Sequence, residues 1–140
     1  MRESAVADRD RDVAALLAVN ERFYEVFAAG DLAAMMRLWA ESLPVACIHP
    51  GAPVIVGREA VLASWRQVLG SPPPVKSVDA TAHPLPDGGG FVTCYERIAD
   101  GALAATNVFA REGGEWRMVH HQAGPTSARP RREPPPQTVH

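Results

Sequence analysis

The chain has 140 residues, 46% of them hydrophobic, which is typical of one globular domain with a single core. Its 14 basic and 16 acidic residues give a formal net charge of −2, which argues against a nucleic-acid-binding or anionic-membrane-binding surface. No apolar run has the length of a membrane span and no secretory signal follows Met1, so we expect a cytoplasmic protein that does not contact a membrane.

Apolar periodicity predicts three helices in the first half of the chain. The first follows a charged, aperiodic start, ends at Gly30, and has at helical spacing Val13, Leu16, Leu17, Asn20, Phe23, Tyr24 and Phe27. Asp31 is a suitable N-cap for the second, whose apolar side is Leu32, Met35, Met36 and Trp39. Short strands are expected at residues 45–49 and 54–56. The third helix ends before three consecutive prolines and carries Val61, Leu62, Trp65, Val68 and Leu69.

From residue 75 onward, the apolar period changes to the two-residue period of strands. Four segments follow this pattern: residues 75–83, 91–99, 103–111 and 115–123. Glycine-rich links join them, and glycine readily adopts the positive φ angles that tight hairpins need. The sequence therefore predicts an antiparallel meander. Helices before strands indicate an α+β fold with the helices covering one face of the sheet.

The two cysteines suggest no cofactor. Cys47 and Cys94 lie in apolar runs without a metal-ligand spacing, so we expect buried, reduced thiols and no bound metal.

Residues 1–124 form the predicted domain. Residues 125–140 are rich in proline and arginine and poor in apolar residues, so we expect a flexible tail, with binding to a proline-recognition module as the alternative.

Alternation along the strands predicts which side chains point inward. For residues 91–99 the inward set is Val92, Cys94, Glu96 and Ile98. Glu96 is then an ionisable group among apolar neighbours, where desolvation raises the pKa of a carboxyl. Residues 103–111 are mostly apolar on both faces. Such a sheet usually covers its outer face, so we expect a homodimer formed through that face.

Several segments resemble the nuclear transport factor 2-like (NTF2-like) superfamily and, within it, the SnoaL-like group. They are Asp31 to Trp39, His49-Pro50-Gly51, Gly57-Arg58-Glu59-Ala60-Val61, Thr106-Asn107-Val108-Phe109 and Trp116-Arg117-Met118-Val119-His120-His121. The resemblance covers about residues 10–125. It implies a cone-shaped, cystatin-like barrel of three helices on a curved mixed sheet, with an apolar cavity. The superfamily includes polyketide cyclases, ketosteroid isomerases, dehydratases and a kinase association domain, so the fold alone implies no reaction.

The last strand is where this resemblance adds most. Apolarity does not decide between His120 and His121, but similarity to the association domain of calcium/calmodulin-dependent kinase implies an inward set of Arg117, Val119, His121 and Ala123. It also places Asn107 inward. Asn107 and Ala123 stand where that domain carries arginines, a departure that weakens the analogy to its carboxylate binding.

These arguments give a candidate site. The predicted catalytic residues are Glu96 and His121, and the predicted ligand contacts are Asn107, His49, Trp65, Tyr24 and Phe23. A carboxyl of raised pKa can exchange a proton near neutral pH, while an amide and an imidazole can bind a developing oxyanion.

Structural alternatives remain for each residue of this site. Glu96 could be neutralised by His121 or Arg58, and the aromatic residues could simply be core. Asp79, a further carboxylate, is expected to face outward.

We therefore predict a cofactor-free protein that binds a small molecule in an apolar pocket with a few polar groups. The alternatives are a cofactor-independent isomerase, cyclase or dehydratase that uses Glu96 and His121, and a dimeric scaffold.

Overall fold

A computed structural model describes residues 2–130 of the chain. These residues form an α+β fold with three α-helices and a six-stranded mixed sheet. The elements are α1 (Arg2–Ala29), α2 (Leu32–Leu38), β1 (Ala46–Ile48), β2 (Ile55–Val56), α3 (Arg58–Leu69), β3 (Lys76–Leu85), the 3-10 turn η1 (Pro86–Gly88), β4 (Gly89–Ile98), β5 (Gly101–Glu112) and β6 (Glu115–Pro125). None of the helices within this range has the length and apolar character that a bilayer crossing needs.

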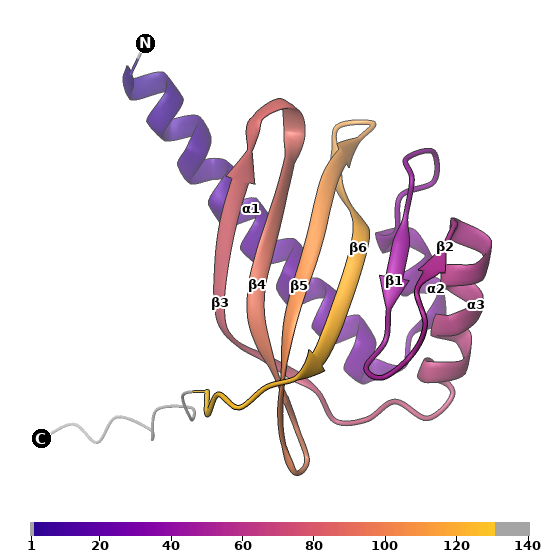
Figure 1. Cartoon of the computed structure of the whole chain (residues 1–140). Helices are drawn as coiled ribbons and strands as arrows, with labels where there is room; N and C mark the ends of the chain where they lie inside the picture. The colour runs from indigo at the N-terminus through magenta and orange to yellow at the C-terminus, as the bar shows by residue number, and fades with distance from the viewer. Residues whose placement is uncertain (1, 131–140) are drawn as a thin grey trace, which may run out of the picture.

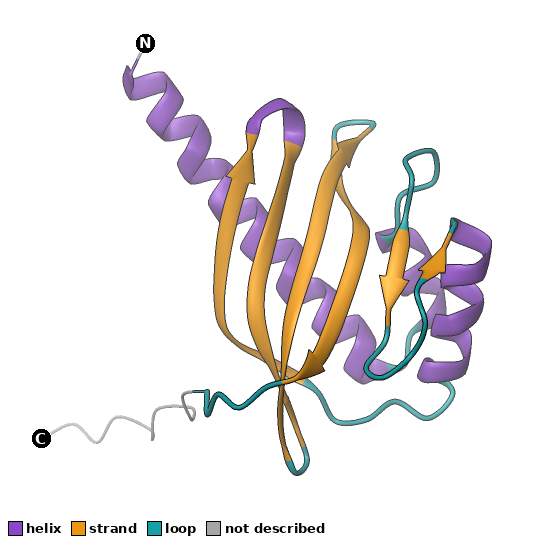
Figure 2. Cartoon of the chain, viewed as in Figure 1, coloured by secondary structure: helices purple, strands orange, loops and turns teal. Residues whose placement is uncertain are grey.

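The sheet has the strand order β2-β1-β6-β5-β4-β3. β3 to β6 form the predicted antiparallel meander, while β1 pairs with β6 in parallel. Short turns join the meander strands (Figure 2), and Gly113 and Gly114 adopt φ angles of 61° and 82° between β5 and β6. Inward-pointing residues from the middle of each meander strand therefore lie side by side on one face of the sheet.

The long helix α1 crosses that face diagonally, and α2 and α3 lie beside β1 and β2 (Figure 1). Its apolar stripe is buried, with Leu16 and Phe23 at 0% exposure. The helix begins at Arg2, well before the predicted start. The early residues are exposed and lack apolar periodicity, but they contain no proline or glycine, so the packed part of the helix extends into them at little cost.

The junction of α1 and α2 follows the predicted capping. Gly30 has a φ angle of 67°, and the Asp31 side chain accepts a hydrogen bond of 3.0 Å from the Ala34 amide. The second helix is shorter than predicted, because Trp39 has extended backbone angles and pairs with Met118 of β6. Trp39 therefore joins the core from a strand-like segment.

The inward set predicted for β6 is wrong in part. His121 and Ala123 are buried as predicted, but Met118, with 0% exposure, replaces Arg117 and Val119 as an inward residue. The cause is a bulge: Val108 pairs with His120 and Phe109 with Met118, so Val119 has no partner on β5. One extra residue reverses the alternation, which simple two-residue periodicity cannot reveal.

Only the first part of the predicted C-terminal tail lies within the described residues. β6 ends at Pro125, and residues 126–130 form neither helix nor strand. Residues 131–140 lie outside the described residues, so the flexible tail stays a prediction.

Close packing between α1 and β4 gives a first testable consequence. A β-carbon added at Gly90 would lie 2.6 Å from Leu16 Cδ1 and 3.2 Å from the His83 carbonyl oxygen. We expect Gly90→Ala to lower the free energy of unfolding by about 1–3 kcal/mol, because the buried leucine has little room to move. Gly124→Ala is the matched control, since nothing lies within 4 Å of its added β-carbon. Equal urea midpoints for the two variants would contradict this packing.

Candidate functional site

A cluster of polar side chains is buried between α1 and the inner face of the meander. Its members and their exposed fractions are Asn20 (1%), Tyr24 (2%), Glu96 (3%), Asn107 (0%) and His121 (1%). We call these five residues the polar network. Asn20 and Tyr24 are four residues apart and so share one side of α1. Asn107 and His121 are directly paired between β5 and β6.

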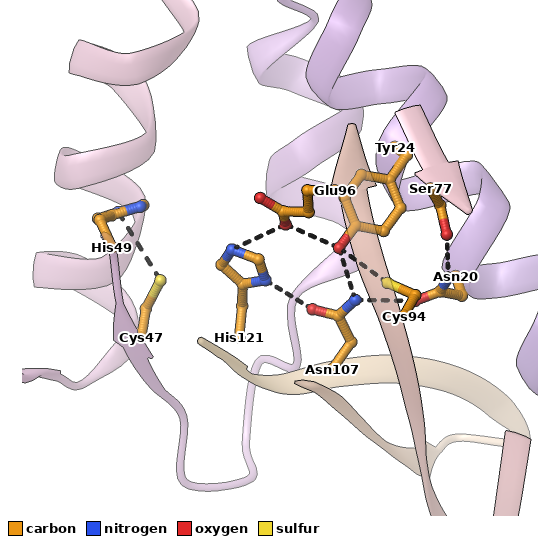
Figure 3. Close-up of polar contacts among 9 residues, drawn as sticks. All are labelled: Asn20, Tyr24, Cys47, His49, Ser77, Cys94, Glu96, Asn107 and His121. Carbon is orange, nitrogen blue, oxygen red and sulfur yellow. Dashed lines mark hydrogen bonds and ion pairs between the residues drawn. The ribbon is translucent and has the colours of Figure 1, made fainter. Parts of the chain in front are cut away.

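The polar network closes into a ring of contacts (Figure 3). His121 Nδ1 lies 2.6 Å from Asn107 Oδ1, and Asn107 Nδ2 donates to the Tyr24 hydroxyl at 3.0 Å. The Tyr24 hydroxyl donates to Glu96 Oε2 at 2.8 Å. Glu96 Oε2 lies 3.7 Å from His121 Nε2, which closes the ring. Four side chains from one helix and three strands thus fix one another.

One branch leaves the ring through Asn20 of α1 to β3, and another leads from Tyr24 to Cys94 of β4. Asn107 Nδ2 also donates to Asn20 Oδ1 at 2.8 Å, and Asn20 Nδ2 donates to Ser77 Oγ at 3.3 Å. The Tyr24 hydroxyl lies 3.4 Å from Cys94 Sγ. Both amide hydrogens of Asn107 are therefore used, as buried polar groups require.

Burial sets the charge state of the facing pair. Desolvation raises the pKa of Glu96 to about 7, although the hydrogen bond from Tyr24 opposes the rise. Desolvation, with the nearby His49 and His120, lowers the pKa of His121 to about 3. Near pH 6 the carboxyl is therefore protonated and the imidazole is neutral. Glu96 is then poised to exchange a proton near neutral pH.

An aromatic shell surrounds His121. The ring centroid of His121 lies 5.0 Å from that of Phe23 and 5.6 Å from that of Trp65. Phe27 packs edge-on against Trp65 at 4.9 Å. Within the described residues, the buried indole nitrogens of Trp65 and Trp39 have no oxygen or nitrogen acceptor. The shell keeps the pair dry, which strengthens its electrostatic interactions.

His49 lies at the edge of this shell and is half-buried. Its Nε2 lies 2.9 Å from Ser64 Oγ and 3.7 Å from Cys47 Sγ, and burial lowers its pKa. Burial also raises the pKa of the Cys47 thiol to about 12 and raises that of Cys94. Both free thiols are thus protonated and poor nucleophiles. Across residues 2–130 no group of three or more metal-binding side chains is arranged around a common point.

The structure brings the predicted site residues together. Glu96, Asn107, His121 and Tyr24 belong to the polar network, Phe23 and Trp65 to the aromatic shell, and His49 to its edge. Asp79 is exposed, as expected. The Arg58 alternative for Glu96 is wrong, because that guanidinium donates to the carbonyl oxygens of Met36, Trp39 and Ala40.

Asn20 is the member of the polar network that sequence reasoning missed. It stood in the predicted apolar stripe of the first helix, where a polar residue needs a buried partner. That mismatch was the available signal, and Asn107 is the partner.

The predicted pocket is occupied by side chains. Phe23, Trp65 and the polar network are all at most 3% exposed and pack on one another. A hollow of about 420 Å³ lies instead on the outer face of the sheet, where the lining side chains include Thr93, Tyr95, Thr106 and Gln122. A molecule that reached Glu96 would therefore have to displace shell side chains.

The long helix crossing a mixed sheet is an NTF2-like, cystatin-like fold, as in solved structures of that fold with TM-scores of 0.70 and 0.67. Residues 16–126 match the family model for the SnoaL-like domain, and the chain belongs to this family.

Solved structures and a curated relative agree with this assignment. A proposed dehydratase of the NTF2-like family from Streptomyces avermitilis has a TM-score of 0.76 and 27% identity, covering 85% of this chain and 99% of that one. A proposed calcium/calmodulin-dependent protein kinase type II association domain from Thiobacillus denitrificans has a TM-score of 0.62 and 36% identity, covering 79% and 94%. The F-box protein SKIP8 of Arabidopsis thaliana is 32% identical over 116 residues, 78% of this chain and 48% of the relative. The chain thus spans about half the length of that relative.

The raised pKa of Glu96 predicts how stability depends on pH. The folded state binds this proton more tightly than the unfolded state, whose carboxyl has a pKa of 4.5. The stabilising contribution is complete below pH 4.5 and is lost as pH rises through about 7. We expect Glu96→Gln to gain up to about 3 kcal/mol relative to wild type between pH 4 and pH 8 in urea unfolding.

Glu59→Gln makes the same change of carboxyl to amide on an exposed part of α3 and serves as the control. A stability difference between Glu96→Gln and wild type that stays constant with pH would contradict the buried, protonated carboxyl.

Proposed function

We propose that this SnoaL-like domain binds a small oxygenated molecule between Glu96, His121 and the aromatic shell. The observation that carries the proposal is the 3.7 Å separation of Glu96 Oε2 and His121 Nε2, which is too long for a direct hydrogen bond. A buried carboxyl and a buried imidazole thus face each other without a hydrogen bond between them, so each can still bond to a third group. A ligand oxygen placed beside them would use that capacity.

The weakly partnered indole nitrogen of Trp65 supports the same location. Trp65 is fully buried, and its ring packs beside His121 and His49. Its nitrogen has no oxygen or nitrogen acceptor within the described residues, and the Cys47 thiol beside it is a weak acceptor. A buried donor without a strong acceptor costs free energy that a ligand carbonyl or hydroxyl would recover. We propose that His49 and Trp65 rotate to admit the ligand. His49 is the more exposed of the two, so the ligand would enter from its side.

The charges of the polar network support an uncharged ligand. Its described members are a carboxyl, an imidazole, a phenol and two amides, without lysine or arginine. An anionic ligand would meet Glu96 without a fixed cation to compensate it. An uncharged carbonyl or hydroxyl compound avoids that cost.

Acid–base catalysis is the second candidate function, and the pKa of Glu96 near 7 supports it. A carboxyl that exchanges its proton at neutral pH can act in isomerisation, cyclisation or dehydration. The 27% identity to a proposed dehydratase points the same way. In this proposal the ionised fraction of Glu96 removes a proton from the α-carbon of the ligand and the resulting carboxyl returns a proton to the ligand, while His121 Nε2 accepts a hydrogen bond from a ligand hydroxyl.

Proton exchange tests both candidates without a known substrate. A panel of uncharged ketones and hydroxy ketones is incubated with the protein in D2O, and exchange at the α-carbon is followed by NMR. We expect Glu96→Gln to slow exchange by about 100-fold or more while the compound still raises the melting temperature, because the amide binds but cannot transfer a proton.

Glu59→Gln is again the control and should retain exchange. Equal exchange in Glu96→Gln and wild type would contradict catalysis by Glu96. The absence of any thermal shift across the panel, together with no co-purifying small molecule in native mass spectrometry, would contradict binding.

We also propose that the domain forms a homodimer through the outer face of the sheet. The hollow on this face is lined mostly by uncharged side chains, including Ala104 and Thr106 of β5, with Asp79 as a charged one among them. The 36% identity to a proposed association domain supports assembly as a role.

Light scattering during size-exclusion chromatography tests the dimer. We expect a mass of about twice 15.0 kDa for wild type. Thr106→Arg should give a monomer, because it buries an unpaired charge at the interface. Ala63→Arg, on an exposed part of α3, should remain dimeric. A monomeric wild type would contradict the proposal.

A further inference from the structure

Two amides of the polar network form a short chain that ends on His121. Asn20 Oδ1 accepts from Asn107 Nδ2 at 2.8 Å, and Asn107 Oδ1 lies 2.6 Å from His121 Nδ1. Figure 3 shows the two amides and the imidazole in line, with Glu96 on the other side of the ring. All four side chains are at most 3% exposed, so water does not compete for these bonds.

These two amides determine which nitrogen of His121 carries the hydrogen. The Asn107 nitrogen faces two oxygens, Asn20 Oδ1 and the Tyr24 hydroxyl, so its two hydrogens are directed at them. This leaves the Asn107 oxygen facing His121 Nδ1. An amide oxygen can only accept, so Nδ1 must carry the hydrogen. In a neutral imidazole Nε2 is then a bare acceptor.

We propose that Asn107, oriented by Asn20, is a positioning residue that keeps the His121 proton on Nδ1 and leaves Nε2 bare toward Glu96. Its functional meaning rests on the proposed role of the Glu96–His121 pair. The tautomer itself can be measured without a ligand.

The tautomer decides how the pair can react. With Nε2 bare, the pair consists of a proton donor and a hydrogen-bond acceptor, and Nε2 can accept a hydrogen bond from a ligand hydroxyl placed beside the Glu96 carboxyl. With the hydrogen on Nε2, the imidazole would donate to Glu96 and hold it as a carboxylate. Asn107 therefore acts through His121 and does not itself need to touch the ligand.

Two-bond proton–nitrogen NMR correlation on nitrogen-15-labelled protein near pH 7 is the test. We expect a pyrrole-type shift for His121 Nδ1 and a pyridine-type shift for Nε2. A pyridine-type Nδ1 in wild type would overturn the proposal, because it would mean that both amides are turned by 180°. This measurement decides the matter even if a variant fails to fold.

Variants then separate positioning from packing. In Asn107→Leu the acceptor is lost, and we expect the two His121 shifts to exchange completely. Asn107→Asp restores an oxygen acceptor and should restore the pyrrole-type Nδ1. Ser77→Ala, at the far end of the chain, should leave the tautomer unchanged, because Asn20 Oδ1 still accepts from Asn107.

An unchanged tautomer in Asn107→Leu would overturn the proposal. Ligand binding by a protein with the wrong tautomer would refute this inference and leave the proposed function standing. The predicted tautomer in a protein that binds none of the compounds would support this inference and contradict the proposed function.

Discussion

Burial of Glu96 against His121, without an arginine or lysine in the polar network, is the constraint on which the rest of the site depends. An ionised carboxylate in such a place is costly, so the carboxyl retains its proton to a higher pH. The aromatic shell maintains this state by excluding water, and the Tyr24 hydroxyl limits it by donating to Glu96. Desolvation keeps the imidazole neutral, and Asn107 Oδ1 lies 2.6 Å from its Nδ1. Removing any one of these side chains would leave a buried polar group of the network without its partner.

The fold supplies these partners through register and packing. The pairing of β5 with β6 sets Asn107 opposite His121, and the bulge at Val119 lets both Met118 and His121 point inward. α1 then covers the network, with Asn20 and Tyr24 one turn apart. A residue inserted into β6 or a shifted α1 would separate groups that now lie within 4 Å. The site is thus a property of the meander and of the helix that crosses it.

Sequence reasoning predicted the parts of the site that depend on simple alternation. Glu96 faces inward because β4 keeps a strict two-residue period, whereas both faces of β5 are mostly apolar and only the family resemblance implied an inward Asn107. The same reasoning failed at Arg117 and Val119, because a bulge is set by tertiary pairing rather than by composition. The role of Asn107 as a ligand contact stays a prediction, and Asn20 and Tyr24 accept its amide hydrogens. Side-chain hydrogen bonds across 83 or 87 positions leave no local pattern in a single sequence.

Membership in the SnoaL-like family fixes the architecture, while the chemistry depends on one carboxyl. The most direct test of the account is a carbon-13 NMR titration of the Glu96 carboxyl in the intact chain, assigned with Glu96→Gln. The account predicts a titration midpoint of about 7. A midpoint at the ordinary value of 4.5 would show an ionised, solvated carboxylate and would contradict it.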